Sequence, residues 1–186
     1  MTPAEATDFI RPAVARHPGD WADLGAGTGT FTAALARLLG APHTITAVER
    51  DPAALKQLHA LASNLPRTAA TVQVRHADLA DPAALDILPP KTLAGVLFGN
   101  VLHYFADPLP LLRQATARLS PDGAVVVLEY EGARANPWIP HPLSVSRLTE
   151  FAEAAGLNPP DVVSETTSRY HGTLYCAVLR NQQFRA

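Results

Sequence analysis

Short runs of apolar, β-branched residues alternate with longer stretches rich in alanine and leucine along the whole chain. The short runs predict buried strands, and apolar residues at helical spacing in the longer stretches predict helices. Strands are predicted over residues 21–24, 44–48, 71–75, 93–98, 124–129, 161–167 and 173–179. This alternation favours an α/β fold with a mostly parallel sheet.

The stretches between the strands carry the start and stop signals of helices. Thr2 and Glu5 have the spacing of a capping box, with Pro3 at the first helical position. Pro12 is expected to kink or restart this N-terminal helix within residues 1–19. Further helices are predicted over residues 30–39, 52–63, a short segment from 81, 108–119 and 144–156.

Three connections stand out for their composition. Residues 120–123, Ser-Pro-Asp-Gly, predict a turn before the fifth strand. Residues 130–143 form a proline-rich loop that follows the carboxyl end of that strand. Long loops in this position often carry function, so we treat residues 130–143 as a candidate substrate loop. The last two strands are expected to form a hairpin around Tyr170 and His171.

Length and composition indicate one domain, residues 1–186, because 186 residues suit a single core. A formal net charge of −2 argues against binding nucleic acid through bulk electrostatics. Cys176 is the single cysteine and cannot form an internal disulfide, which is compatible with a reducing compartment. No apolar run approaches the roughly 20 residues that span a bilayer. We therefore expect a cytoplasmic protein without a membrane span. A homodimer is a further expectation, because a second protomer could cover a ligand pocket that a chain of this length leaves open.

The segment from Asp23 to Thr30, Asp-Leu-Gly-Ala-Gly-Thr-Gly-Thr, joins the first predicted strand to a helix. Its three alternating glycines permit positive φ angles and let a ligand approach the backbone closely. The free N–H groups at the start of the following helix favour an anionic ligand group. A tight strand-to-helix turn also needs glycine, so the spacing alone does not establish a ligand site.

Two acidic residues stand at the ends of neighbouring strands. Glu49 ends the second strand, about 20 residues after the glycine turn, where a carboxylate can accept hydrogen bonds from both ribose hydroxyls of a cofactor. Asp78 follows the third strand and can accept a hydrogen bond from an adenine amino group. Open α/β sheets bind ligands at the carboxyl ends of their strands, so these groups predict one nucleoside-binding site.

On these residues the chain resembles the class I S-adenosylmethionine-dependent methyltransferases, from about residue 21 to residue 179. The glycine turn resembles the family's first motif, Glu49 its acidic end of strand two, and residues 77–79 its adenine-contacting segment. Asn100 matches the motif after strand four, and residues 119–124 match the turn before strand five. The resemblance implies a doubly wound, Rossmann-like sheet of seven strands, mostly parallel, with an antiparallel strand in a C-terminal hairpin.

The resemblance further implies an enzyme that uses S-adenosyl-L-methionine. Asp23 is expected to bind the ammonium group of the methionine moiety or to orient the glycine turn. The implied cofactor-binding residues are Asp23, Gly25, Ala26, Gly27, Gly29, Thr30, Glu49, Arg50, Asp78, Leu79 and Asn100.

Two other nucleotide-binding classes fit the glycine turn less well. Nicotinamide and flavin dehydrogenases prefer Gly-x-Gly-x-x-Gly, whereas Thr30 stands where their third glycine falls. A phosphate-binding P-loop is excluded because no Gly-Lys-Ser/Thr sequence follows.

The methyl acceptor is predicted to be a small molecule. Asn100 precedes Val-Leu-His-Tyr, without the prolines found after strand four in related enzymes that methylate amino groups of DNA or protein glutamine. No basic stripe with interleaved aromatic residues is present either, so a nucleic-acid partner is not expected. Two alternatives stay open: a macromolecular acceptor, protein or RNA, and a cofactor-binding partner subunit without turnover of its own.

Five residues near the expected methyl group are candidates for acting on the acceptor. His103 and His141 are candidate catalytic residues, since histidine exchanges protons near neutral pH, although a packing role is the alternative. Tyr104, Tyr130 and Trp138 are candidate substrate contacts, because aromatic side chains often line ligand pockets. No metal site is predicted, because the remaining histidines lack a ligand-like spacing.

Overall fold

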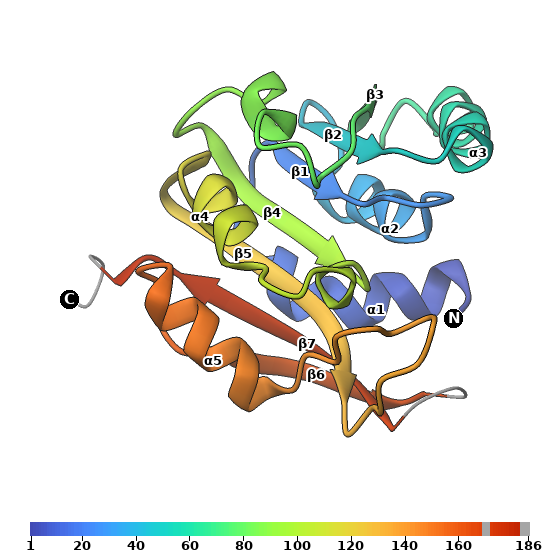
Figure 1. Cartoon of the computed structure of the whole chain (residues 1–186). Coiled ribbons are helices and arrows are strands. Elements are labelled where there is room, and N and C mark those ends of the chain that lie inside the picture. The colour runs from blue at the N-terminus through green and yellow to red at the C-terminus, as the bar shows by residue number, and fades with distance from the viewer. Residues whose placement is uncertain (169–171, 183–186) are drawn as a thin grey trace.

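A single sheet of seven strands runs through the computed structural model, which describes residues 1–168 and 172–182 (Figure 1). The strand order is β3-β2-β1-β4-β5-β7-β6. The strands are β1 Trp21–Leu24, β2 Thr44–Glu49, β3 Thr71–His76, β4 Leu93–Gly99, β5 Leu119–Glu131, β6 Asp161–Thr167 and β7 Thr173–Arg180. β1 to β5 pair in parallel, and β7 is antiparallel to both β5 and β6. The predicted α/β sheet, mostly parallel with an antiparallel C-terminal hairpin, is confirmed; Tyr170 and His171 lie outside the described residues.

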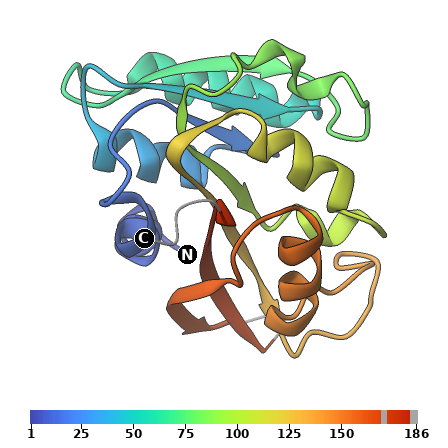
Figure 2. The same ribbon diagram turned by 90° about the vertical axis from the view of Figure 1, so that its left-hand side faces the viewer.

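Helices cover both faces of this sheet (Figures 1 and 2). The helices are α1 Pro3–Val14, α2 Thr30–Leu39, α3 Pro52–Asn64, α4 Leu109–Thr116 and α5 Val145–Ala154, with 3-10 segments η1 Ala84–Ile87 and η2 Leu102–Tyr104. α1 packs against α2 on one face, and α4 packs against α5 on the other. Figure 2 shows α1 and α5 on opposite sides of the sheet. Each face has its own apolar cluster, so the sheet is buried on both sides, as a parallel sheet requires.

The helix starts follow the local signals in the sequence. The Thr2 hydroxyl accepts a hydrogen bond from the Glu5 N–H at 3.3 Å, and the Glu5 carboxylate accepts one from the Thr2 N–H at 2.7 Å. This is the predicted capping box. The Asp51 carboxylate caps α3 by accepting from the N–H groups of Ala53 and Ala54. The helix α1 continues through Pro12 to Val14, so the expected restart at this proline is not found.

The segment between α4 and β5 differs from its prediction. The helix α4 ends at Thr116, and Leu119, expected at the end of this helix, instead pairs with Leu93 as the first residue of β5. The next pair is Gly95 with Ala124, so residues 120–123 leave the ladder as a bulge within β5 rather than as a separate turn. The apolar side chains of residues 109–119 had suggested a longer helix, but strand pairing takes precedence over their helical spacing.

The chain order reverses between β1 and β4, which lie side by side in the sheet. Connections from β1 and from β4 therefore leave toward opposite sides and open a crevice at the carboxyl ends of these strands. Ligands of open α/β sheets bind at such a switch point. The glycine turn after β1, Glu49 at the end of β2, Asp78 after β3 and Asn100 after β4 all lie there.

Candidate functional site

The glycine turn is held against the end of β2 by its own backbone. The N–H groups of Gly25 and Ala26 both donate to the carbonyl oxygen of Val48 at 2.9 Å. Gly25 has a φ of 75°, and a Cβ atom there would collide with a methyl group of Val101, which follows β4. This position therefore needs glycine both for its conformation and for the close approach of the neighbouring loop.

Gly29 has a different part in the same turn. It is the N-cap of α2, with a φ of 94°, and no side chain caps this helix. The first N–H groups of α2 therefore remain available to a ligand.

The carboxylate of Glu49 is 9% exposed and organises the surrounding backbone. One oxygen accepts from the Gly27 N–H at 2.8 Å. The other accepts from the N–H groups of Arg50 and Asp51 at 2.7 and 2.8 Å. A carboxylate has about four acceptor positions, so these three bonds leave about one free. Glu49 can therefore accept from one further hydroxyl while it keeps its present bonds, and from two if the Gly27 bond is exchanged.

Asp23 lies at the end of β1 and is almost completely buried, at 1% exposure. Its carboxyl group accepts a hydrogen bond from the Thr32 hydroxyl at 2.5 Å. Burial raises the pKa of Asp23 to about 7; the Thr32 hydrogen bond opposes this increase and the nearby Glu49 charge adds to it. A cationic ligand group beside Asp23 would favour its ionised form.

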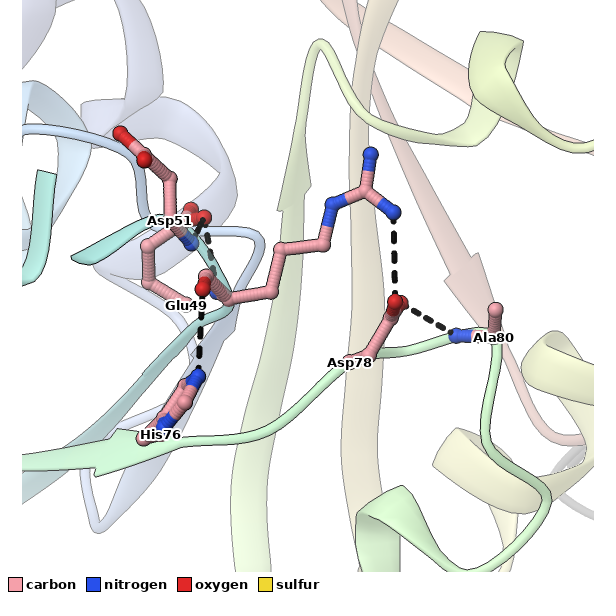
Figure 3. A network of polar contacts seen from close by, with 6 residues as sticks. Glu49, Asp51, His76, Asp78 and Ala80 are labelled. Carbon is pink, nitrogen blue, oxygen red and sulfur yellow. Dashed lines mark hydrogen bonds and ion pairs between the residues drawn. The ribbon is translucent and has the colours of Figure 1, made fainter. Parts of the chain in front are cut away.

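Arg50 and Asp78 form an ion pair that links the ends of β2 and β3 (Figure 3). The Arg50 guanidinium donates to Asp78 at 3.2 Å, and the Ala80 N–H donates to the other Asp78 oxygen at 3.0 Å. The Ala80 hydrogen bond, followed by the Arg50 contact, lowers the pKa of Asp78. The His76 ring contacts the Arg50 carbonyl oxygen at 3.2 Å, which further fixes the backbone that carries the guanidinium.

These groups surround a cavity of about 680 Å³ at the carboxyl ends of β1 to β4. Ten of the eleven predicted cofactor-binding residues line it: Asp23, Gly25, Ala26, Gly27, Thr30, Glu49, Arg50, Asp78, Leu79 and Asn100. Gly29 does not line the cavity; it is the N-cap residue of α2. Three apolar residues of the lining, Phe31, Val48 and Val101, were not predicted, because apolar residues near strand ends have no local signature that separates pocket from core.

Asn100 shows that this cavity has an unfilled polar position. Its φ of 58° is rare for residues other than glycine and is best tolerated by asparagine and aspartate. Its backbone N–H donates to Leu128 at 2.9 Å, whereas its buried side-chain oxygen has no hydrogen-bond partner among the described residues. Buried polar atoms are normally satisfied, so this oxygen indicates a missing donor. The turn, the two acids and Asn100 fit a nucleoside-containing cofactor with a cationic amino-acid part.

A second cavity of about 870 Å³ adjoins the first, lined by α1, β6 and the end of β5. Thr30, Phe31 and Asn100 line both cavities. Of the predicted substrate contacts, Tyr130 lines the second cavity and Tyr104 lines the first. The sequence reasoning missed this cavity, since its walls come from opposite ends of the chain.

His103 is buried, lines neither cavity, and pairs with Glu129 of β5. The two side chains are 3% and 0% exposed, and His103 Nδ1 lies 2.8 Å from a Glu129 oxygen. The other Glu129 oxygen accepts from the His103 backbone N–H at 3.1 Å. The ring centroid of His103 lies 4.5 Å from that of Tyr104 and 6.4 Å from that of Tyr130. Glu129 was not predicted, although an acid inside an apolar strand is a recognisable signal.

The candidate substrate loop is only partly connected to this region. The His141 N–H donates to the His103 carbonyl oxygen at 2.9 Å, which ties the loop to η2. Trp138 is 76% exposed, and neither it nor His141 lines either cavity. The roles predicted for these two residues stay predictions. In the described part of the chain, no group of histidine, cysteine or acidic residues is arranged to hold a metal ion, and no helix is long and apolar enough to cross a membrane.

The fold and the site together define an α/β domain whose cavity at the switch point fits a nucleoside-containing cofactor. Within this class, residues 22–125 match the family of methyltransferase domains, and the chain belongs to that family. Among curated proteins, none matches the sequence. The predicted family, enzyme class and cofactor, S-adenosyl-L-methionine, are thereby confirmed at the level of the family.

Solved structures of methyltransferases share this fold at low sequence identity. An arsenic(III) S-adenosylmethionine methyltransferase from Chlamydomonas reinhardtii is 18% identical, with a TM-score of 0.70 over 86% of this chain and 62% of that enzyme. A SAM-dependent methyltransferase from Aquifex aeolicus is 16% identical, with a TM-score of 0.69 over 95% of this chain and 93% of that one. NcsB1, an O-methyltransferase from neocarzinostatin biosynthesis, is 20% identical, with a TM-score of 0.64 over 90% of this chain and 50% of that one. The chain thus spans less than two thirds of the algal enzyme and half of NcsB1.

Proposed function

We propose that this protein transfers a methyl group from S-adenosylmethionine to a small-molecule acceptor. The observation that carries the proposal is the pair of adjoining cavities that share Thr30, Phe31 and Asn100. A methyl donor in the first cavity and an acceptor in the second would meet at these residues. The volume of the second cavity, about 870 Å³, lies in the range typical of small-molecule sites.

The first cavity is assigned to the cofactor on the basis of its polar groups. Glu49 is placed to accept from ribose hydroxyls, Asp78 to accept from an adenine amino group, and Asp23 to pair with an ammonium group. S-adenosylmethionine supplies a methyl group on a positively charged sulfur, so the protein's contribution is to orient the reactants. NcsB1 was solved with S-adenosylmethionine and 2-hydroxy-5-methyl naphthoic acid, which supports both the cofactor and the class of acceptor.

The buried pair of His103 and Glu129 is proposed to accept the proton that a hydroxyl or amine acceptor loses. A carboxylate only accepts hydrogen bonds, so its contact with Nδ1 assigns the proton to that nitrogen and leaves Nε2 as the basic atom. Glu129 also fixes the ring through the His103 backbone N–H. In this role His103 holds the proton and Glu129 is a positioning residue that stabilises the protonated ring.

The first test measures binding and transfer together. We expect calorimetry to show binding of S-adenosylmethionine and S-adenosylhomocysteine but not of NAD, and labelled methyl transfer to one or more members of a panel of phenols, carboxylates, amines and phospholipids. The variant Ser164→Trp, which fills the second cavity, should abolish transfer and keep the affinity for S-adenosylhomocysteine. Binding of NAD alone would refute the assignment of the cofactor cavity. Transfer only to protein or RNA would favour a macromolecular acceptor, and co-purification with a partner without transfer would favour a partner subunit.

A second test addresses the proton acceptor. We expect His103→Ala to lower the transfer rate about 100-fold or more, a typical size for general base catalysis, and to remove the acidic limb of the pH–rate profile. Glu129→Gln should lower the rate less and shift that limb, whereas a purely structural pair would leave its position unchanged. Circular dichroism checks that each variant is folded. An unchanged profile in His103→Ala would show that this histidine is a packing residue.

A further inference from the structure

The two oxygens of the Glu49 carboxylate differ in what they still offer to a ligand. One oxygen accepts from the N–H groups of Arg50 and Asp51, which fills both of its acceptor positions. The other oxygen accepts from the Gly27 N–H at 2.8 Å and keeps one position. A ribose carries two neighbouring hydroxyl groups and can offer two donors to this carboxylate. In the present arrangement only one of these donors finds an acceptor position.

Of the three backbone bonds to Glu49, the bond from Gly27 is the one that can be exchanged. Arg50 and Asp51 follow Glu49 directly in the chain, and Asp51 is fixed as the N-cap of α3. Their N–H groups therefore stay beside the carboxylate when a ligand binds. Gly27 belongs to a separate connection, 22 residues earlier in the chain, so it can move away while Glu49 and α3 stay in place.

The glycine turn allows the Gly27 peptide group to move between two fixed points. On one side the Ala26 N–H donates to the Val48 carbonyl oxygen at 2.9 Å, and on the other the Gly29 N–H donates to the Ala26 carbonyl oxygen at 3.0 Å. Within the described part of the chain, the Gly27 N–H donates only to Glu49. Apart from its chain neighbours, no described atom lies within 4 Å of the place that a Cβ would take at Gly27. This peptide group therefore has space to turn without a rearrangement of β1, β2 or α2.

A released Gly27 N–H needs a new acceptor, and the cofactor can supply one. Asp23, Gly27 and Glu49 line the same cavity. The proposed function places the ammonium group of S-adenosylmethionine beside Asp23, and the carboxylate of that amino-acid half is bonded to the same carbon atom. A carboxylate that accepts from a backbone N–H forms a charge-assisted hydrogen bond, which is stronger than a bond between neutral groups.

We propose that the hydrogen bond between Gly27 and Glu49 is a latch that couples the two halves of the cofactor: the second ribose hydroxyl displaces the Gly27 N–H from Glu49, and the released N–H binds the carboxylate of the amino-acid half. This inference rests on the proposed function, because it concerns the cofactor cavity of the same reaction. A ligand without the carboxylate only exchanges one hydrogen bond for another. A ligand with both groups gains one hydrogen bond overall.

Two pairs of compounds measure this coupling. S-adenosylhomocysteine and 5′-methylthioadenosine share the adenosine part, and only the first has the amino-acid half; each is compared by calorimetry with its 2′-deoxy form. We expect loss of the 2′-hydroxyl to weaken S-adenosylhomocysteine about tenfold and 5′-methylthioadenosine about twofold or less. The 3′-deoxy forms should give the same pattern. Equal losses for the two compounds would overturn the proposal.

Amide hydrogen exchange, followed by NMR on ¹⁵N-labelled protein, observes the latch itself. Binding of 5′-methylthioadenosine should speed the exchange of the Gly27 N–H, because this N–H has left Glu49 without gaining a carboxylate. The 2′-deoxy form should leave the exchange slow, and S-adenosylhomocysteine should make it slow again. The Gly25 N–H is the control within the same turn, since it donates to Val48 in every state. Unchanged exchange at Gly27 with 5′-methylthioadenosine would refute the latch.

A pair of variants assigns the coupling to Glu49. In Glu49→Gln one acceptor oxygen is replaced by an N–H donor, which cannot hold the Gly27 N–H, so loss of the 2′-hydroxyl should weaken the two compounds by the same factor. Glu150→Gln changes an exposed acid of α5 that does not line the cavity and should keep the unequal factors of the wild type. Circular dichroism checks that both variants are folded. Unequal factors that persist in Glu49→Gln would contradict the proposal.

Failure of this inference can be told apart from failure of the proposed function. If S-adenosylhomocysteine does not bind, the cofactor assignment is wrong and the inference falls with it. If S-adenosylhomocysteine binds and the 2′-hydroxyl contributes equally in both compounds, the cofactor assignment stands and only the latch is refuted.

Discussion

The replacement Asp23→Asn should make the protein more stable than the wild type above neutral pH. The same replacement should lower the affinity for the cofactor. Asp23 is 1% exposed and its pKa is raised from 3.8 to about 7, mainly because burial disfavours the charged form. The folded state therefore holds its proton at pH values where the unfolded state has released it. Stability falls as the pH rises from about 4 through about 7, because the unfolded state then binds fewer protons.

The size of this effect follows from the two pKa values. A tenfold difference in proton affinity corresponds to about 1.4 kcal/mol, so an increase from 3.8 to about 7 lowers the unfolding free energy by about 4 kcal/mol across the interval. Asparagine keeps an acceptor for the Thr32 hydroxyl and does not ionise. The unfolding free energy of Asp23→Asn should therefore not fall over this pH interval. Measured relative to its value at pH 4.5, the unfolding free energy at pH 8 should be higher for Asp23→Asn than for the wild type.

Urea unfolding followed by circular dichroism between pH 4.5 and pH 8, without cofactor, measures this difference. The exposed Asp122→Asn is a matched control and should keep the pH dependence of the wild type. In parallel, calorimetry in buffers of different ionisation enthalpy should detect proton release when S-adenosylmethionine binds to the wild type near pH 6.5. The reasoning is refuted if Asp23→Asn and the wild type lose stability in parallel as the pH rises.

Two further predictions concern the cofactor acids and the proline-rich loop. Glu49→Gln replaces one acceptor oxygen by an N–H donor that faces backbone N–H groups, so it should lower the affinity for S-adenosylhomocysteine about 10-fold to 100-fold. Asp78 is exposed, so Asp78→Asn should lower this affinity only a few-fold. Equal losses of affinity in calorimetry would contradict this order. Trp138→Ala should leave cofactor affinity unchanged. It should lower the transfer rate if the exposed loop closes over the acceptor, whereas unchanged initial rates would identify residues 130–143 as a surface cover.

The gathering of the predicted cofactor residues around one cavity could be foreseen because their signals are local in the sequence. The glycines stand between a strand and a helix, and Glu49 and Asp78 each end a strand. Parallel strands bring such ends to one edge without any detailed knowledge of packing. What the pattern did not indicate is that Glu49 already accepts three backbone hydrogen bonds, because this depends on the conformation of the turn.

The environment of the acceptor residues was less predictable, because it depends on contacts between distant segments. His103 was singled out by its position after β4, but its partner Glu129 comes from the neighbouring strand β5 and required the register of the sheet. Trp138 was expected to face the acceptor because of its loop, and is exposed. Loop composition does not fix the direction of a side chain.

In the proposed function the second cavity holds the acceptor, and most of its lining comes from the two ends of the chain, whereas the first cavity is lined by residues 23–105. β7 inserts between β5 and β6 and so places β6 at the edge of the sheet, where it contacts α1 (Figure 1). Neither α1 nor β6 contributes to the cofactor cavity. If the proposed function holds, substitutions on the α1 and β6 walls of the second cavity are expected to alter acceptor binding without disturbing Asp23, Glu49 or Asp78.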